Sequence, residues 1–332
     1  MKLLFWVTIT LFFLSVEATT IAGELYLAFW NVENLFDTHD HPLVQRDEEF
    51  TPGSDKQWTE ERLQTKLQNL ARVIREMNDN RGPDILGVCE VENRTIIEAL
   101  LTKLGSLGRN YQIIHQDSPS GRGIDCAIIY DDQTVELNSC RFLFVDAGNT
   151  RDIVEAAFSV GETPLYVFVN HWPSKRNPES ARIVAAETLR RRIDEILAQD
   201  NNAAIVVLGD LNDSPTADSI YKHLNASKDA HPLPPGALFN TTWSLHTNPQ
   251  QGTCVYDNKW QVIDQIIISP GLLDEVGLTW KPSSTQAVRH QYQLLAPKDS
   301  NDIPRPRPSY REDSFDPKGF SDHLPISCVI QF

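Results

Sequence analysis

The stretch AIVVLGDLNDSP, residues 204–215, opens as a run of branched apolar side chains and changes after Gly209 to the polar residues Asp210 and Asn212. An apolar run bounded in this way predicts a buried strand that ends in polar side chains. In layered α/β proteins such strand ends gather at one rim, so we expect their side chains to converge from distant parts of the sequence. The same change from apolar to polar follows other strand-like runs, at Asn31, Glu90, Asn170 and His171.

Helical patterns separate the strand-like runs. Apolar side chains recur at three- and four-residue steps in residues 58–77, which indicates an amphipathic helix. Asn93 is placed to cap a second helix and Asn177 a third, with Pro178 at its first position. The alternation predicts an α/β layered domain. The predicted strands are residues 25–31, 84–89, 111–115, 124–130, 140–145, 164–170, 204–208, 262–269 and 324–332.

The composition fits one large folded domain or two smaller ones, because the chain has 332 residues and 41% of them are hydrophobic. It excludes coiled coils, collagen-like repeats and wholesale disorder. The 30 Lys and Arg residues are outnumbered by 45 Asp and Glu residues, for a formal net charge of −15. No overall positive field therefore attracts nucleic acid or an anionic membrane, and a polyanion would have to be bound by local cations or with a metal.

The N-terminus has the pattern of a secretory signal peptide. Lys2 precedes an apolar run over residues 3–14, and the small side chains of Val16 and Ala18 follow it. We therefore expect residues 1–18 to be a signal peptide, cleaved near Ala18 or Ala22. The alternative is an uncleaved anchor, but the run is too short to span a bilayer comfortably. The expected location is secreted or periplasmic, with no stable membrane anchor after cleavage.

The five cysteines do not form a disulfide scaffold, since their number is odd and most lie in apolar runs. Cys89, Cys126 and Cys328 are interpreted as small buried hydrophobic residues. Cys126 and Cys140 form the one pair we expect to be able to bridge, across a hairpin that turns near Asp132.

Carboxylates at the ends of buried strands indicate a cation site. Glu90 and Asp210 each follow an apolar run, where an unpaired charge is costly and a bound cation would remove the penalty. A single carboxylate at a strand end is more often a cap or a salt-bridge partner, and the joint occurrence of the two favours the cation site. The donors are carboxylate and amide oxygens without a Cys or His pair at zinc spacing, which favours Mg²⁺, with Mn²⁺ and Ca²⁺ as alternatives. A polar, proline-rich stretch, residues 291–320, is expected to be a surface loop beside this site.

A series of motifs follows in order along the chain: FWNVENLFD (29–37), GVCEVEN (87–93), GRGIDCAIIYD (121–131), VNHWPSKR (169–176), GDLNDSP (209–215), VIDQIIIS (262–269) and FSDHLP (320–325). This ordered series resembles the endonuclease/exonuclease/phosphatase family, in particular its exported bacterial nuclease-like branch and more distantly pancreatic-type deoxyribonuclease. The resemblance implies an α/β (α+β) fold, a four-layer sandwich of two packed mixed β-sheets flanked by helices, with residues 23–332 as a single catalytic domain.

The resemblance also implies a metal shell and a pair of histidines. Glu90 would be the principal metal ligand, and the shell would be completed by Asn31, Glu33 and Asp322. His323 would prepare the attacking water, with Asp264 holding its tautomer. His171 would bond a phosphate oxygen or protonate the leaving oxygen, with Asp125 as its orienting partner.

The remaining implied roles concern the nucleophile and the phosphate. Asp210 and Asn212 would position the nucleophile or take a second cation, and the formal base would be either Asp210 or His323. Asn170 would donate to a nonbridging oxygen. The basic residues nearest His171 are expected to bind flanking phosphates. These are Lys175, Arg176 and Arg182.

The motif set predicts an exported, divalent-metal-dependent phosphodiesterase, a nuclease that hydrolyses DNA or RNA by attack of water at phosphorus. One alternative is a phosphatase or phospholipase C-type hydrolase of a small or lipid phosphoester, since the same site serves both reactions. A second is a non-catalytic binding protein on this scaffold. A nucleic-acid substrate is the expected partner, and no obligate protein partner is evident in the sequence.

Overall fold

The computed structural model describes residues 23–42, 44, 46–274, 276–311 and 314–332. The predicted signal peptide, residues 1–18, and both expected cleavage positions lie outside these residues. Among the residues described, no helix is both long enough and apolar enough to cross a bilayer.

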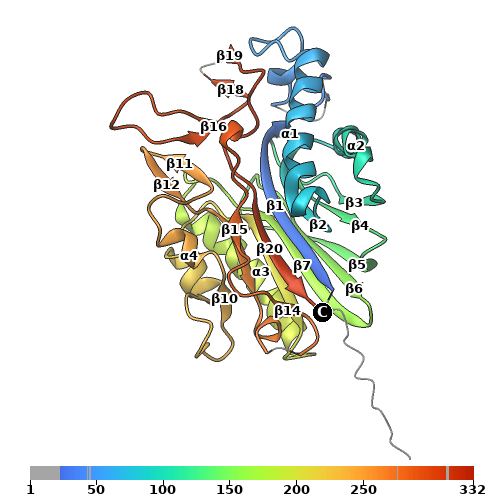
Figure 1. Ribbon diagram of the computed structural model, residues 1–332, viewed down its shortest axis with the longest axis vertical. Coiled ribbons are helices and arrows are strands. Elements are labelled where there is room, and N and C mark those ends of the chain that lie inside the picture. The colour runs from blue at the N-terminus through green and yellow to red at the C-terminus, as the bar shows by residue number, and fades with distance from the viewer. Residues whose placement is uncertain (1–22, 43, 45, 275, 312–313) are drawn as a thin grey trace, which may run out of the picture.

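Two mixed β-sheets form the centre of the molecule (Figure 1). The first has the strand order β14–β20–β1–β2–β4–β3, with β15 also paired to β20, and the second has the order β5–β6–β7–β8–β13–β10–β9. The strands of the first sheet are β1 (Glu24–Leu35), β2 (Ile85–Val91), β3 (Tyr111–His115), β4 (Asp125–Asp131), β14 (Thr279–Trp280), β15 (Gln286–Ala287) and β20 (Ile326–Gln331). Those of the second are β5 (Glu136–Leu143), β6 (Ile153–Val160), β7 (Thr163–His171), β8 (Ala204–Asp210), β9 (Ala226–Ser227), β10 (Leu238–Asn240) and β13 (Asp264–Ile268).

Helices and short hairpins surround the sheets. The helices are α1 (Glu60–Asn80), α2 (Arg94–Lys103), α3 (Glu179–Leu197) and α4 (Trp243–His246), with short turns η1 (Glu48–Phe50), η2 (Gly105–Leu107), η3 (Ser219–His223), η4 (Pro270–Leu272) and η5 (Gln291–Gln293). The hairpins are β11 (Cys254–Tyr256) with β12 (Lys259–Gln261), β16 (Leu294–Leu295) with β17 (Arg305–Pro306), and β18 (Tyr310–Arg311) with β19 (Ser314–Phe315).

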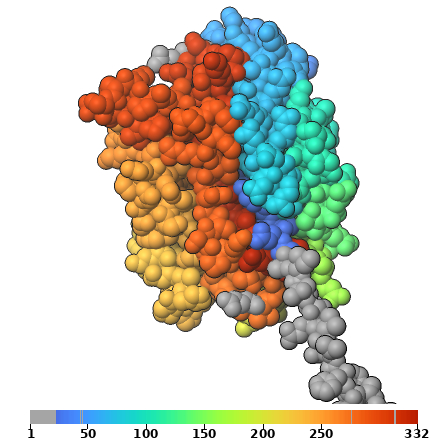
Figure 2. Space-filling view, viewed as in Figure 1, coloured from blue at the N-terminus to red at the C-terminus, as the bar shows by residue number. Residues whose placement is uncertain are grey.

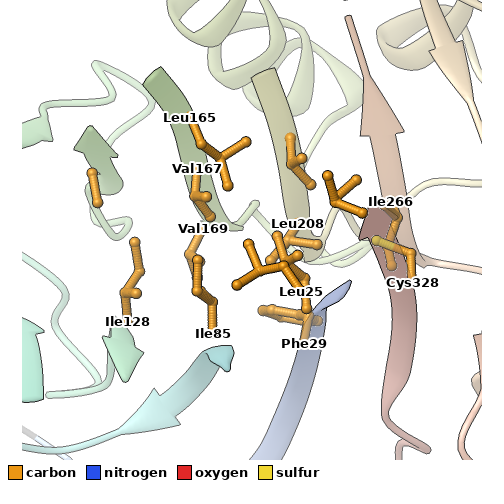
Figure 3. Packing of buried hydrophobic residues seen from close by; sticks show 14 of the residues in the cluster. Leu25, Phe29, Ile85, Ile128, Leu165, Val167, Val169, Leu208, Ile266 and Cys328 are labelled. Carbon is orange, nitrogen blue, oxygen red and sulfur yellow. The ribbon is translucent and has the colours of Figure 1, made fainter. Parts of the chain in front are cut away.

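Apolar side chains fill the space between the sheets and both outer faces, which confirms the predicted four-layer sandwich. Figure 3 shows Phe29 and Ile85 of the first sheet packed toward Val169 and Leu208 of the second. The amphipathic faces of α1 and α2 cover the first sheet, and α3 covers the second. Burial of these apolar faces is the main favourable contribution to the stability of the fold.

The C-terminal part of the chain joins the two halves on the surface. Figure 2 shows it, in orange and red, between α1 in blue and the yellow-orange segments. The amide of Asn69 on α1 donates to the carbonyls of Pro317 and Gly319, and Arg289 donates to the carbonyl of Gln250. The loop expected over residues 291–320 therefore contains the short strands β16–β19 and packs along α1, where Tyr292 also donates to Glu76.

Three local expectations need correction. Cys126 lies on β4 in register with Cys89 on β2, whereas Cys140 is exposed on β5 of the other sheet, so the predicted hairpin and bridge are wrong. Between β4 and β5 the chain passes from one sheet to the other instead of turning back on itself. Asn93 caps α2 as predicted, but α3 begins after Pro178, and Asn177 does not cap it.

Strand β6 was missed by the sequence patterns. Its segment contains alanines and Glu155, residues with low strand propensity. The charge of Glu155 is matched by Arg192 of α3, whose guanidinium donates to both carboxylate oxygens at 2.7 and 2.8 Å. The pairing of β6 with β5 on one side and with β7 on the other therefore outweighs its low local strand propensity.

Backbone irregularities aim polar side chains at one rim. The register of β1 against β2 shifts between Asn31 and Leu35, and that of β2 against β4 shifts between Cys89 and Val91. Glu90, within the second shift, has φ of 63°, a left-handed conformation that is costly for a residue with a Cβ. Bulges of this kind redirect a side chain that a regular strand would point to one of its two faces.

Gly209 is required where β7 and β8 approach closely. A Cβ at this position would lie 2.6 Å from Cβ of Asn170 and 2.7 Å from its carbonyl oxygen, well inside van der Waals contact. We expect Gly209→Ala to lower the free energy of unfolding by about 1–3 kcal/mol, because the two strands must separate. Urea denaturation measures this, with Gly53→Ala as control, since a Cβ there meets no atom within 4 Å. Equal stability of the two variants would contradict the prediction.

Candidate active site

The polar strand ends of both sheets line one cleft of about 810 Å³ at the rim. Strands β1 and β2 contribute from the first sheet, β7 and β8 from the second, and the segment before β20 completes the wall. The sequence-predicted residues that line it are Asn31, Glu90, His171, Arg176, Asp210, Asn212, Asp322 and His323.

His323 is held in place by Asp264, as the sequence predicts. Its Nδ1 lies 2.7 Å from Oδ2 of the fully buried Asp264. Its carbonyl oxygen accepts a hydrogen bond from Nε1 of Trp30 at 3.0 Å, which fixes the backbone. Burial lowers the pKa of His323, but the charge of Asp264 and the hydrogen bond to it outweigh burial and raise the pKa well above its ordinary value. Asp264 therefore orients the imidazole and favours its protonated form.

Asp210 lies between the two histidines. Its Oδ2 is 3.7 Å from Nε2 of His171 and 3.9 Å from Nε2 of His323. Burial, followed by the charge of Asp264, raises the pKa of Asp210 to about 7. The backbone N–H of Asn212 donates to Oδ1 of Asp210 at 3.0 Å, which fixes the carboxylate. Asp210, Asp264 and His323 each offer an atom within 4.8 Å of the others.

Glu90 is kept ionised by its surroundings. Burial would raise its pKa, but Arg122, Arg151 and the backbone N–H of Asn34 together lower it. The N–H of Asn34 donates to Oε2 at 2.9 Å, and Nη2 of Arg122 lies 3.8 Å from the same oxygen.

The arrangement of Glu90 and Asp210 fits a divalent cation. Their carboxylates converge on a single neutral group, because Nδ2 of Asn31 donates to both, at 3.4 and 3.1 Å. These two carboxylates, with the exposed carboxylate of Asp322 in the same cleft, form the oxygen-rich donor set that hard cations prefer. Asn31 turns its amide nitrogen toward them and its Oδ1 accepts from the backbone N–H of Glu33, so its predicted role as a metal ligand is corrected to that of a group that orients the carboxylates. Glu90 and Asp322 would therefore hold the ion, and Asp210 beside Glu90 remains available to accept a proton.

Glu33 is not placed to bind the same ion, which corrects its predicted role. Its Oε2 accepts from the backbone N–H of Ser309 at 2.6 Å and lies 3.5 Å from Nζ of the buried Lys66. Burial raises the pKa of Glu33 to about 7, against the opposing charge of Lys66. The left-handed backbone at Glu33 and Asn34 turns this carboxylate toward α1 and the C-terminal loop.

The predicted pairing of His171 with Asp125 is also wrong. Asp125 lies 3.4 Å from His115 and accepts from the backbone N–H of Ser118 at 3.0 Å. Nε2 of His171 instead lies 3.0 Å from Nη2 of Arg151. Burial, then the charge of Arg151, holds the pKa of His171 well below its ordinary value. His171 is therefore a neutral acceptor that faces a guanidinium.

Three of the four residues predicted to bind phosphate have other partners. Asn170 is fully buried, donates to the carbonyl of Leu208 at 3.2 Å and accepts from Nε1 of Trp172 at 3.1 Å. Arg182 is buried against Asp213, with 2.7 Å between Nε and Oδ2. Lys175 donates to Gln261 at 3.0 Å outside the cleft lining, so Arg176 is the one of the four in the cleft.

The cations that line the cleft were largely missed from the sequence. They are Arg46, Lys56, Arg122 and Arg151, in addition to Arg176. Arg122 lies within the GRGIDC motif, and Arg151 immediately precedes the missed strand β6, so recognition of β6 would have been the signal for Arg151. No periodicity marks either residue, because both lie in loops.

Comparisons with known proteins agree with this architecture. The model of the endonuclease/exonuclease/phosphatase family matches residues 26–331. Truncated TDP2 from Caenorhabditis elegans is 18% identical, with a TM-score of 0.56 over 92% of this chain and 97% of that one. D. rerio TDP2 complexed with single-strand DNA product is 15% identical, with a TM-score of 0.57 over 92% and 98%. A mannosyl-6-phosphatase from Bacteroides thetaiotaomicron is 18% identical, with a TM-score of 0.59 over 93% and 100%. No curated protein sequence matches the chain.

Replacing the expected principal metal ligand should weaken cation binding. We expect Glu90→Gln to raise the Mg²⁺ concentration that half-saturates the rise in unfolding temperature by at least about tenfold, because the variant loses one charged oxygen donor. Thermal unfolding at increasing Mg²⁺, starting from protein treated with EDTA, measures this. Glu136→Gln, on the exposed start of β5, is the control. An unchanged half-saturation point in Glu90→Gln would remove Glu90 from the metal site.

Proposed function

Because the chain belongs to the endonuclease/exonuclease/phosphatase family, whose members are phosphoester hydrolases, we propose that it is an exported Mg²⁺-dependent phosphodiesterase that cleaves DNA or RNA. The observation that carries the proposal is the His323–Asp264 pair facing Asp210, with Glu90 in the same cleft. An oriented imidazolium beside a basic carboxylate is what hydrolysis at phosphorus requires of a protein.

Asp210 is proposed to accept the proton of the attacking water. A carboxyl group whose pKa is about 7 is a stronger base than an ordinary aspartate and is about half ionised at neutral pH. Asn212 keeps this carboxylate oriented through its backbone N–H. The resemblance left Asp210 and His323 as alternative bases, and the raised pKa of His323 favours Asp210.

His323 is proposed to act in its protonated form. Asp264 holds its Nδ1–H, so Nε2–H is free to donate to a phosphate oxygen as negative charge develops there. A divalent cation held by Glu90 would neutralise charge on the phosphate and stabilise the transition state. Neutral His171, with Arg151 at its Nε2, is not placed to be the general acid for the leaving oxygen.

A nucleic-acid substrate is favoured by the local charge and by the form of the cleft. Arg122, Arg151 and Arg176 line it although the chain as a whole is acidic. A second groove of about 820 Å³ shares Asp322 with the cleft lining and gives room for a backbone beyond the scissile phosphate, although its Arg305 is paired with Asp302. One similar structure, D. rerio TDP2, holds a single-strand DNA product.

The second candidate is a phosphatase that acts on a small phosphoester. The similar structure of a mannosyl-6-phosphatase favours it, because that protein has the same fold over its full length. The predicted phospholipase-type reaction belongs with this candidate. A non-catalytic binding protein is disfavoured, because a decayed site would not keep His323, Asp264 and Asp210 in contact.

A substrate panel separates these candidates. Plasmid DNA, single-stranded DNA, RNA, a chromogenic phosphodiester and a sugar phosphate are incubated with purified protein, with Mg²⁺ and with EDTA. We expect cleavage of nucleic acid that EDTA abolishes, and a kcat of Asp264→Asn lower by about 10²–10⁴-fold, because the amide no longer holds the imidazolium. The exposed Asp146→Asn is the control. Hydrolysis of the sugar phosphate alone would transfer the proposal to the second candidate, and an unchanged rate in Asp264→Asn would refute the role of the pair.

The export part of the proposal rests on the signal-peptide pattern of residues 1–18. We expect the mature protein, secreted or periplasmic, to begin at residue 19 or 23, because peptidases cut after small residues such as Ala18 and Ala22. N-terminal sequencing of the protein recovered outside the cytoplasm measures this. A chain that keeps Met1 and stays in the cell would contradict export.

A further inference from the structure

Arg151 is a buried cation without a carboxylate partner. The residue is 8% exposed, it lies in the cleft wall just before β6, and its Nε is buried with no hydrogen-bond partner among the described residues. Among the residues that the structure describes, its guanidinium makes one hydrogen bond, from Nη2 to Nε2 of His171 at 3.0 Å. No carboxylate oxygen that the structure describes lies within 4.0 Å of it, and the charge of Glu90 acts on it only from beyond that distance.

Other buried cations of the chain are paired. Arg182 meets Asp213 at 2.7 Å, and Lys66 lies 3.5 Å from Glu33. Arg109, largely buried, contacts both Asp84 and Asp131, at 2.6 and 2.9 Å. A guanidinium that is removed from water without such a partner destabilises the fold unless an anion reaches it. The exception at Arg151 therefore indicates that its partner is a ligand.

The neighbours of Arg151 direct it toward the cleft. His171 accepts through Nε2 and so fixes one end of the guanidinium, which leaves other N–H groups without a protein acceptor. Arg122, the second guanidinium beside Glu90, hydrogen-bonds Oδ1 of Asn34 at 2.5 Å and is partly exposed. Two guanidinium groups in one cleft match the oxygens of a phosphate, which accept paired N–H groups.

We propose that Arg151, positioned by His171 and assisted by Arg122, binds the phosphate group on which the reaction takes place. This inference rests on the proposed function, since it assumes a phosphate ester as substrate. It replaces the predicted phosphate contact of His171 by a contact of Arg151 and makes His171 a positioning residue. The neutral state of His171 follows from this role, because an imidazolium could not accept a hydrogen bond from the guanidinium.

Inorganic phosphate is the probe that tests the proposal without turnover. Thermal unfolding of the purified chain is followed with increasing phosphate, with and without Mg²⁺, for wild type, Arg151→Met and Arg151→Lys. We expect phosphate to raise the unfolding temperature of wild type, and Arg151→Met to need at least about tenfold more phosphate for the same rise. Arg151→Lys should fall between them, because an ammonium group cannot donate as a fork. Arg191→Met, exposed on α3, is the control and should behave as wild type.

A binding role and a purely structural role give different results without phosphate. If the partner of Arg151 is an anionic ligand, Arg151→Met removes a buried charge that is unpaired in the free protein. The unfolding temperature of this variant without phosphate should then stay at or above that of wild type. A large fall in unfolding temperature, with the phosphate response intact in Arg151→Lys, would overturn the proposal. If Arg151→Met does not fold, the phosphate response of Arg151→Lys decides: a weakened response supports the proposal, and an unchanged one overturns it.

His171→Gln tests the positioning role, because its side-chain oxygen can still accept from Arg151. We expect this variant to keep phosphate binding within about threefold of wild type, and His171→Ala to lose at least about tenfold. Equal losses in both variants would mean that His171 binds phosphate itself.

Steady-state kinetics separate failure of this inference from failure of the proposed function. In Arg151→Met, KM for a cleaved ester should rise at least about tenfold, with kcat reduced as well. Normal KM and phosphate binding in Arg151→Met, with hydrolysis intact, would overturn the inference and leave the proposed function standing. If the substrate panel finds no hydrolysis, the phosphate response still decides whether Arg151 binds the anion. A wild-type chain that does not respond to phosphate refutes the inference outright.

Discussion

The site depends on keeping several carboxylates together where water cannot screen them. Asp210 and Asp264 face each other across neighbouring strands in direct register, and Glu90 shares the amide of Asn31 with Asp210. Burial, followed by the repulsion from the charge of Asp264, raises the pKa of Asp210 to about 7. The sheets can sustain this repulsion because three apolar clusters, between and outside the sheets, stabilise the strands that carry these groups.

The backbone geometry at the rim is part of the same constraint. A regular strand would alternate its side chains between the apolar core and the helix layer, so neither face would point Glu90 at Asp210. The register shifts in β1 and β2, with positive φ at Glu33, Asn34 and Glu90, turn these residues out of the alternation. Strained conformations of this kind persist only where the surrounding packing determines them, and here they fall on the residues that approach the cleft.

Much of the fold and half of the site could be predicted from sequence because they depend on local patterns. Apolar runs that end in polar residues located the rim, and the ordered motifs linked His323 to Asp264 before any geometry was known. The partners of Glu33, Asp125 and Arg182 could not be predicted in this way. Their partners, Lys66, His115 and Asp213, come close only when strands and helices pack together. The spacing of residues along the chain does not indicate which of several charged groups will pair in the folded protein.

The charge of the whole chain is a poor guide to the charge that a substrate meets. At −15 the protein should repel a polyanion at long range, yet Arg122, Arg151 and Arg176 line the one cleft that holds the acidic cluster. At about 0.1 M salt, the repulsion between exposed charges is largely screened when they are more than about 10 Å apart, whereas buried charges in contact are screened little. A phosphate that enters the cleft therefore meets guanidinium groups and His323, and a cation bound by Glu90 would offset the charge of the carboxylates. An acidic composition is compatible with an anionic substrate, because the net charge acts at long range and the cations of the cleft act at contact distance.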